Sequence, residues 1–277
     1  TKTEAEVELK EAKAENWKQL IVEGTIGYLA LLRNLRNIVE QTNDEVFKKA
    51  MDMLTDEKRV RKSLVFPHQI DIAFEVLLSE GNFTYSTRKN AVLTAVNKAY
   101  ELSIPNLTEL FTYGRTAIVI DSSGSMTSSV NLNGKRINSR AIEKASLIGA
   151  TLAKGIGADL YHFSDRCEQL SYNPLDTVNT IKQVVLNRMY GGGTEFNTIF
   201  STLKGKYDRV FVISDMQGGD SLLRGSSYQS YVKTNALKRP EQHGRADRAR
   251  IVAHLRDGYF ARRIKKAHLF YSFSERL

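Results

Sequence analysis

The arrangement of apolar residues changes near residue 113, and this change limits the fold more than any other feature. Before it, stretches such as residues 17–41 repeat apolar side chains at helical spacing. After it, short apolar runs such as residues 116–121 alternate with helical patterns. We therefore predict a helical domain over residues 1–112 and an α/β domain over residues 113–277.

Four stretches of the first predicted domain have the periodicity of amphipathic helices. Asn43 is suited to cap the second of them, and Pro67 fits the first turn of the third. Helices of similar length joined by short polar turns favour stacked helical pairs, so we predict a helical-repeat architecture. The four stretches are residues 17–41, 43–56, 66–81 and 86–104.

The second predicted domain alternates strands with helices. Runs that are apolar throughout are typical of strands buried on both faces, which predicts a mostly parallel, doubly wound sheet. In such sheets ligands bind beyond the carboxyl ends of the strands. The predicted strands are residues 116–121, 159–165, 168–172, 208–215 and 267–273, and the predicted helices are residues 139–156 and 175–189.

Oxygen-bearing side chains gather at the predicted carboxyl ends of two strands. A D-x-S-x-S motif begins at the end of the first strand, a Gly-rich turn carries a threonine, and a second aspartate ends a later strand. Carboxylate and hydroxyl oxygens suit Mg²⁺, and also Ca²⁺ or Mn²⁺, but are poor ligands for zinc. The candidate metal ligands are Asp121, Ser123, Ser125, Thr194 and Asp215.

The same turns could in principle belong to a hydrolase, to a phosphate-binding loop or to ordinary loop structure. Residues 122–126, SSGSM, lack the first glycine of a nucleophile elbow, and residues 191–196, GGGTEF, do not complete a phosphate-binding loop. No histidine follows near Asp215 to complete a Ser-His-Asp hydrolase. Ser, Asp and Gly also favour ordinary turns, and this interpretation stays open for the first motif taken alone. We predict no enzymatic activity.

The oxygen cluster resembles the metal-ion-dependent adhesion site of von Willebrand factor A domains. Asp121, Ser123 and Ser125 match its first element, Thr194 the second and Asp215 the third. The resemblance implies that Ser123, Ser125 and often Thr194 bind the metal directly, and that both aspartates act directly or through water. It also implies that the site captures an acidic group of a protein partner.

The helical half is similar to the TROVE module of the Ro autoantigen family. Residues 27–38, GYLALLRNLRNI, and residues 64–77, LVFPHQIDIAFEVL, carry this resemblance. In that family a helical-repeat ring precedes a von Willebrand A domain, and small noncoding and misfolded RNAs are bound. A complete ring needs several times the helical residues found before the α/β half, so we expect a truncated or minimal form.

Positive charge is concentrated near the end of the chain. The formal net charge is +9, and residues 221–266 contain 12 Lys and Arg against three Asp and Glu. This region lies in a basic insertion that we place at residues 217–266, and it suits phosphate binding, although a solvated surface explains it equally well. The candidate RNA contacts are Arg33, Arg36, Lys58, Arg59, Arg61, Lys62, His68, Arg262, Arg263, Lys265 and Lys266, with the four cations from Lys58 to Lys62 expected in a loop.

The cysteine content and the length of the apolar runs bear on the cellular location of the protein, and two strand residues bear on the metal site. Cys167 is the only cysteine, which excludes an internal disulfide and a cysteine-based zinc site and favours a cytoplasmic protein. No apolar run reaches the ~18 residues of a membrane span. His162 is interpreted as a structural residue of a buried strand. Asp165 ends the same strand and either approaches the metal crevice or serves the turn.

Together these features predict a noncatalytic RNA-binding component of a ribonucleoprotein, with small or structured RNA as one partner and an acidic protein group at the metal site as another. Two alternatives stay open. One is a metal-dependent protein-interaction module, and the other is a subunit of a larger, phage-like assembly that binds no RNA. The sequence does not identify the RNA, the protein partner or the oligomeric state.

Overall fold

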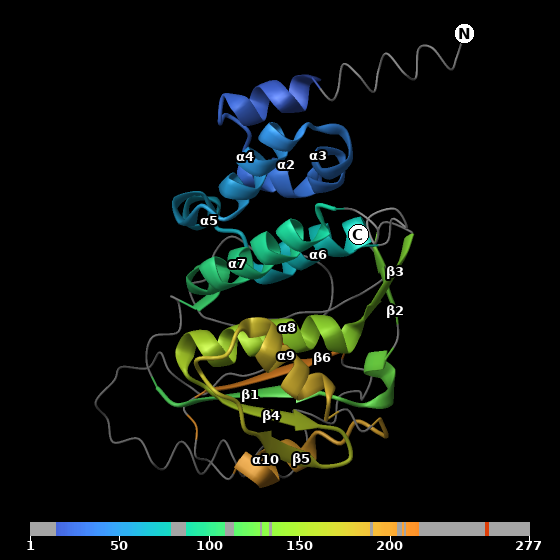
Figure 1. Cartoon of the computed structure of the whole chain (residues 1–277). Helices are drawn as coiled ribbons and strands as arrows, with labels where there is room; N and C mark the ends of the chain where they lie inside the picture. The colour runs from blue at the N-terminus through green and yellow to red at the C-terminus, as the bar shows by residue number, and fades with distance from the viewer. Residues whose placement is uncertain are drawn as a thin grey trace. The chain divides into compact units, whose positions relative to one another are not determined.

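The described residues of the first part of the chain form helices and no strands, and strands alternate with helices in the second part (Figure 1). The two parts are separate units, Thr1–Leu107 and Thr108–Leu277. This mixed α/β organisation confirms the predicted fold class. The computed structural model describes residues 15–78, 87–108, 114–127, 129–132, 135–188, 191–203, 207, 209–215 and 253–254.

Between residues 15 and 78 the helices of the first unit follow one another through short turns. Among the described residues, no helix combines the length and apolar character needed to cross a membrane. Each helix buries one apolar face, as the periodicity predicted. The described helices are residues 15–22, α2 (Tyr28–Arg33), α3 (Leu35–Gln41), α4 (Asp44–Leu54), α5 (Glu57–Ser63), α6 (Pro67–Leu78) and α7 (Lys89–Thr108).

The predicted helical stretch 17–41 is divided into shorter helices rather than being continuous. Gly24 adopts a left-handed φ of 71°, which ends the helix at residues 15–22. Asn34 separates α2 from α3, and its side chain donates to the carbonyl oxygen of Ala30 at 2.9 Å. Arg33 and Arg36 therefore lie on two different helices, contrary to the prediction that one helix carries both.

Helix α5 corrects a second prediction, because the cations expected in a loop between residues 58 and 62 are helical. Asp56 caps this helix by accepting the backbone N–H of Arg59 at 2.8 Å. Asn43 caps α4 in the predicted way, accepting the N–H of Val46 at 2.9 Å. Helix α7 also differs from the prediction, since it continues past Pro105 to Thr108 instead of ending at residue 104.

Polar contacts connect the helices of the first unit. The Tyr28 hydroxyl donates to the carbonyl oxygen of Leu54 at 2.8 Å, which joins α2 to the end of α4. Arg88 donates to the carbonyl oxygen of Val39 at 2.8 Å and pairs with Asp44, and its guanidinium lies 4.6 Å from the ring centroid of Phe47. These contacts satisfy backbone groups at helix ends that would otherwise be buried without partners.

The second unit is built on a five-stranded sheet with the order β5-β4-β1-β6-β7. All neighbouring pairs are parallel except β4 and β5, so the sheet is mostly parallel as predicted. The predicted strand at residues 267–273 lies outside the described residues. The strands are β1 (Thr116–Asp121), β4 (Asp159–Phe163), β5 (Cys167–Leu170), β6 (Arg209–Ser214) and β7 (Ala253–His254).

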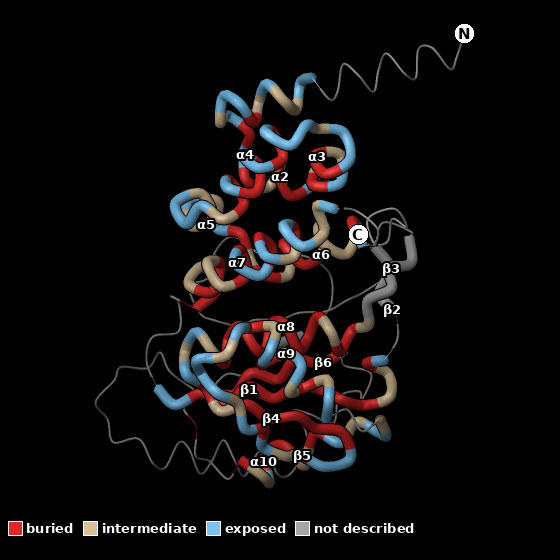
Figure 2. The backbone as a smooth tube through the Cα atoms, viewed as in Figure 1, coloured by how far each residue is buried: buried red, intermediate tan, exposed pale blue. Residues whose placement is uncertain are grey.

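Helices cover both faces of this sheet, and the central strands β1, β4 and β6 are buried along almost their whole length (Figure 2). Helix α8 (Ala141–Ile156) covers one face, where Gly149 lies against Ile118 and Ile120. Helix α10 (Asn197–Leu203) covers the opposite face in a cluster with Ala117 and Val119. Alternate β1 residues thus serve opposite cores, which explains why the strand is apolar throughout. Helix α9 (Val178–Leu186) lies beside α8.

Strand register brings the carboxyl ends of the central strands to one edge. Ile120 is level with His162 of β4 and with Ile213 of β6. The segments that follow β1 and β6 therefore begin side by side, as they must if Asp121 and Asp215 are to contribute to one site. The sequence did not predict the hairpin between β1 and α8, formed by β2 (Ser129–Leu132) and β3 (Lys135–Arg140).

Replacing Gly149 with alanine should destabilise the second unit. An added Cβ would lie 2.4 Å from Cδ1 of Ile120, whose side chain is fully buried. Overpacking of this kind costs about 1–3 kcal/mol, more than the roughly 1 kcal/mol that alanine gains over glycine in a helix. The free energy of unfolding from urea denaturation measures the effect. Gly27→Ala is the control, because open space surrounds that position, and a stabilised Gly149→Ala protein would contradict the expectation.

Candidate metal centre

Asp121 is the most deeply buried of the candidate ligands. It ends β1, and its side chain is not exposed to solvent. One carboxylate oxygen, Oδ1, accepts the backbone N–H of Ser123 at 2.9 Å, and the other, Oδ2, accepts the hydroxyl of Ser214 in a short hydrogen bond. A single carboxylate therefore joins the loop after β1 to the end of β6.

The loop after β1 turns tightly and brings its two motif serines together. The Oγ atoms of Ser123 and Ser125 are 3.2 Å apart, and the short helix η2 (Gly124–Thr127) follows the first of them. Ser123 is buried, whereas Ser125 is partly exposed. The D-x-S-x-S spacing thus places one carboxylate and two hydroxyls on the same side of one loop.

The Gly-rich turn that contains Thr194 lies against this loop. The N–H of Gly191 donates to the carbonyl oxygen of Ser122 at 3.2 Å, and the N–H of Gly124 donates to the carbonyl oxygen of Gly192 at 3.0 Å. Gly191 and Gly192 both have positive φ values, 68° and 86°, which glycine adopts without strain. Thr194 is partly exposed and lies two residues beyond Gly192.

Asp215 directly follows β6 and acts on Asp121 through its charge. Burial raises the pKa of the Asp121 carboxyl above its ordinary value of 3.8, and the negative charge of Asp215 adds to this increase. The hydrogen bonds from Ser123 and Ser214 lower the same pKa without cancelling the effect of burial. The two carboxylates are thus close enough to repel each other, and a cation between them would relieve that repulsion.

The residues at this edge suit a hard divalent cation. Their donors are carboxylate and hydroxyl oxygens, which match Mg²⁺, Ca²⁺ or Mn²⁺. Among the residues that the structure describes, no group of three or more His, Cys, Asp or Glu side chains is arranged to hold a metal. Any ion held here would therefore depend on the serine and threonine hydroxyls as well as the two aspartates. Metal binding by these five residues stays a prediction.

A serine and a histidine beside this site are close enough to suggest a nucleophile and a base. Ser122 Oγ lies 3.1 Å from Nδ1 of His162, and Nε2 of that ring lies 4.0 Å from a carboxylate oxygen of Glu168. However, the Ser122 hydroxyl donates to the carbonyl oxygen of Phe163 at 3.0 Å and is inaccessible to solvent. Burial also lowers the pKa of His162. The pair therefore fastens β1 to β4, and we assign it no nucleophilic role.

The candidate RNA contacts of the first unit differ in their surroundings. Arg59 donates to the carbonyl oxygens of Gly24 at 2.6 Å and Ile26 at 3.2 Å, so its guanidinium stabilises that turn. His68 is partly exposed and stacks against Phe66, with ring centroids 5.9 Å apart. The exposed cations are Arg33, Arg36, Lys58 and Lys62, with Arg61 partly exposed, and Arg262, Arg263, Lys265 and Lys266 lie outside the described residues.

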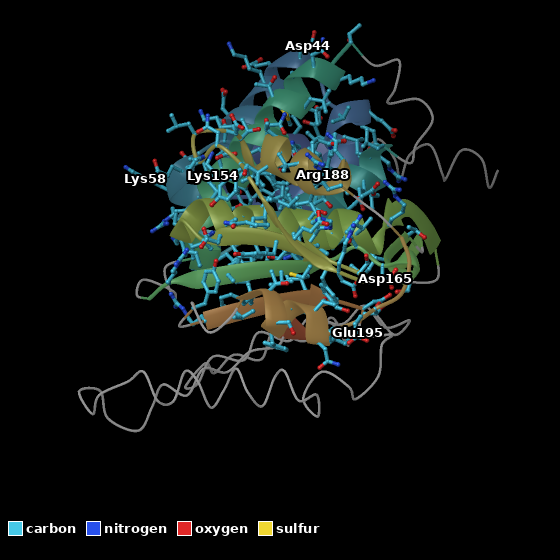
Figure 3. The ribbon with its side chains drawn as sticks, turned by 90° about the horizontal axis from the view of Figure 1, so that it is seen from below. Asp44, Lys58, Lys154, Asp165, Arg188 and Glu195 are labelled. Carbon is cyan, nitrogen blue, oxygen red and sulfur yellow. The ribbon has the colours of Figure 1, made fainter. Side chains whose placement is uncertain are left out.

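Sequence reasoning missed one residue that shapes the site, Ser214, whose hydroxyl donates to Asp121. A polar residue directly before the final aspartate of an otherwise apolar strand was the available signal. For Asp165 the sequence predicts a place either at the metal crevice or in a turn, and in the structure its carboxylate accepts the N–H of Gly193 at 2.9 Å and so contacts the Gly-rich turn. Figure 3 shows Asp165 and Glu195 at the same end of the sheet.

The geometry defines a class of protein in which a helical unit precedes an α/β unit with an oxygen-lined strand edge. The family of the TROVE domain matches residues 2–118. A solved structure, the RO (RSR) protein of Deinococcus radiodurans, is similar with a TM-score of 0.58 and 19% sequence identity. The similarity covers 86% of this chain and 48% of that protein, so the chain spans about half of its structural relative. No curated protein matches in a sequence comparison.

The match over residues 2–118 places a TROVE domain in the N-terminal part of the chain. This confirms the family resemblance of the helical half. The structural similarity at 19% identity adds the fold alone. The von Willebrand A resemblance of the second unit stays a prediction that depends on the strand-edge residues.

The metal-free protein should become more stable when Asp121 is replaced by asparagine at neutral pH. The pKa of Asp121 is raised in the folded state, so the folded protein holds this proton more tightly than the unfolded chain. Stability from this group is therefore present at low pH and is lost as pH rises from about 3.8 through the raised value. Asparagine cannot ionise, its carbonyl oxygen can still accept the N–H of Ser123, and its amide N–H can donate to the Ser214 hydroxyl in a reversed hydrogen bond.

Urea denaturation in a chelator at several pH values measures this difference. The advantage of Asp121→Asn should be largest near pH 7 and vanish below the ordinary carboxyl pKa of 3.8. Added Mg²⁺ should stabilise the wild-type protein and leave Asp121→Asn nearly unchanged, because only the wild-type protein offers the buried anionic ligand. A constant difference between the two proteins at all pH values would contradict this account.

Proposed function

We propose that this protein is a noncatalytic RNA-binding component of a ribonucleoprotein, in which the helical unit contacts RNA and the α/β unit carries a metal-dependent adhesion site. The observation that carries the proposal is the TROVE match over residues 2–118. The TROVE/Ro family is associated with RNA binding. The RNA expected as a partner is small or structured.

Helix α5 supplies the best candidate phosphate contacts among the described residues. Lys58 and Lys62 are exposed and lie one helical turn apart, so their ammonium groups share one face of the helix. Arg61 is partly exposed beside them. Point charges of this kind bind phosphates without reading a base sequence. Arg59 is excluded from this surface, because its guanidinium is engaged by two backbone carbonyl groups.

The basic segment 221–266 supports the same proposal from the sequence. Its 12 Lys and Arg outnumber its three Asp and Glu by nine, and this excess equals the net charge of the whole chain, +9. Binding of an RNA backbone releases condensed counterions, and dense positive charge favours this release. We assign the four cations Arg262, Arg263, Lys265 and Lys266 to RNA phosphates, in addition to those of the helical unit.

The strand edge of the second unit supports a Mg²⁺ site, with Ca²⁺ or Mn²⁺ as substitutes, in a von Willebrand A-like domain. The ligands would be Asp121, Ser123, Ser125, Thr194 and Asp215, and the ion would attract a carboxylate from a protein partner. The residues themselves hold the loops in place, through the Asp121 hydrogen bonds and the backbone bonds of the Gly-rich turn. We place the protein in the cytoplasm, where its lone cysteine stays reduced.

A second candidate function is a protein-interaction module that acts through the metal site without RNA. The self-contained geometry of the strand edge favours it, since every contact described there lies within the second unit. A role as one subunit of a larger assembly is a variant of this candidate. RNA affinity and metal-dependent docking must therefore be measured separately.

RNA binding should depend steeply on salt and should weaken when Lys58 and Lys62 are both replaced by alanine. Each lost phosphate contact should reduce the slope of log affinity against log salt by about 0.7 to 0.9. Fluorescence anisotropy with a labelled hairpin RNA that has a single-stranded tail, between about 50 and 300 mM salt, measures this slope.

The matched control for this experiment removes equal charge from another surface. Lys48 and Lys98 are exposed on α4 and α7, so Lys48→Ala combined with Lys98→Ala should leave the slope close to that of the wild-type protein. Equal losses in the two double variants would mean that charge alone matters and that α5 is no specific surface. A flat response of the wild-type protein to salt would remove the RNA proposal.

Loss of the metal site should separate the two activities. Asp121→Ala combined with Ser123→Ala removes a buried carboxylate and an adjoining hydroxyl of the candidate site. Divalent-ion binding, measured by calorimetry with Mn²⁺, should be abolished, while affinity for the hairpin RNA should change less than about twofold because the phosphate contacts lie elsewhere. Loss of RNA binding by a variant whose circular dichroism is unchanged would contradict this division.

A further inference from the structure

The Gly-rich turn at residues 191–195 is held between two loops of the sheet edge. On one side it is bonded to the loop after β1, through Gly191 and Gly192. On the other side the N–H of Glu195 donates to the carbonyl oxygen of Ser164 at 3.0 Å, just after β4. The turn that carries Thr194 therefore takes its position from its neighbours.

The Asp165 side chain fills the space beside this turn that its glycines leave open. Its Oδ1 accepts the N–H of Gly193 at 2.9 Å. A Cβ added at Gly192 would lie 2.4 Å from Asp165 Oδ2, and one added at Gly193 would lie 2.8 Å from Oδ1. Two successive glycines thus accommodate one carboxylate, which a side chain at either position would displace.

We propose that Asp165 is a positioning residue for the metal site, because it fixes the turn that presents Thr194 to the ion. This inference rests on the proposed metal site and extends it by a residue outside the five candidate ligands. A hydrogen bond from an N–H group to a carboxylate is stronger than one to a neutral acceptor, so it can hold a turn even at the protein surface. Thr194 directly follows Gly193, and its location depends on where that N–H is anchored.

Mn²⁺ affinity of the full chain tests the role of Asp165. Asp165→Ala should weaken binding by about 10-fold or more, the usual effect of removing a residue that orients a metal ligand. Asp165→Asn keeps a carbonyl oxygen in the same place and should restore most of the affinity. Glu40→Ala removes an exposed carboxylate from the helical unit and should leave affinity unchanged. The melting temperature of all three variants should stay near that of the wild-type protein.

A pair of glycine variants isolates the contact with the carboxylate. Gly191 and Gly192 both have positive φ, but an added Cβ meets Asp165 only at Gly192. Gly192→Ala should therefore weaken Mn²⁺ binding more than Gly191→Ala. The Gly191→Ala variant measures only the effect of placing alanine at a positive φ. In the Gly192→Ala background the carboxylate is already displaced, so Asp165→Ala should add little further loss.

Two independent measurements separate failure of this inference from failure of the metal proposal. Amide hydrogen exchange at Gly193 without metal should become faster in Asp165→Ala and stay slow in Asp165→Asn. If the wild-type protein binds Mn²⁺, Asp121→Ala abolishes binding and Asp165→Ala matches the wild-type protein, the positioning role is overturned and the metal site stands. If the wild-type protein binds no Mn²⁺, both are overturned.

Discussion

The buried carboxylate of Asp121 is the interaction on which the sheet edge depends. It accepts hydrogen bonds from the loop that follows it and from the hydroxyl of Ser214 at the end of the neighbouring strand. Burial disfavours its ionised form, and the charge of Asp215 adds to that cost. A polar group is thus kept at a strand end where an apolar residue would pack at lower cost, which indicates a function other than stability.

Much of this fold could be predicted from the sequence, because long periodic segments and fully apolar strands carry strong signals. The strands around Val119 and Val212, the cap at Asn43 and the helix start at Pro67 follow from residue type and spacing. The division of residues 17–41 could not be predicted with the same certainty, since its apolar spacing continues across Gly24 and Asn34. There, packing against the other helices decides the outcome.

The candidate site was predictable in its residue types and only partly in its geometry. The D-x-S-x-S motif identifies a turn that presents oxygens, and strand order places Asp215 beside it. By contrast, the positive charge of Arg59 and its cationic neighbours in sequence suggested a phosphate contact. In the structure its guanidinium instead donates to backbone carbonyl oxygens and stabilises a turn. Asp165 shows the same limit, because its partner is an N–H group of Gly193, 28 positions away in sequence. Contacts between side chains and distant backbone leave little trace in local sequence.

The hydrogen bond between Asp121 and Ser214 spans 93 positions of the chain. During synthesis, the first loop leaves the ribosome long before the strand that completes its surroundings. The nascent polypeptide therefore has no assembled edge until β6 has docked beside β1, and contacts of such sequence separation form late because closing long loops is entropically costly. Any ligand that requires the assembled edge therefore cannot bind before β6 has been made and has docked.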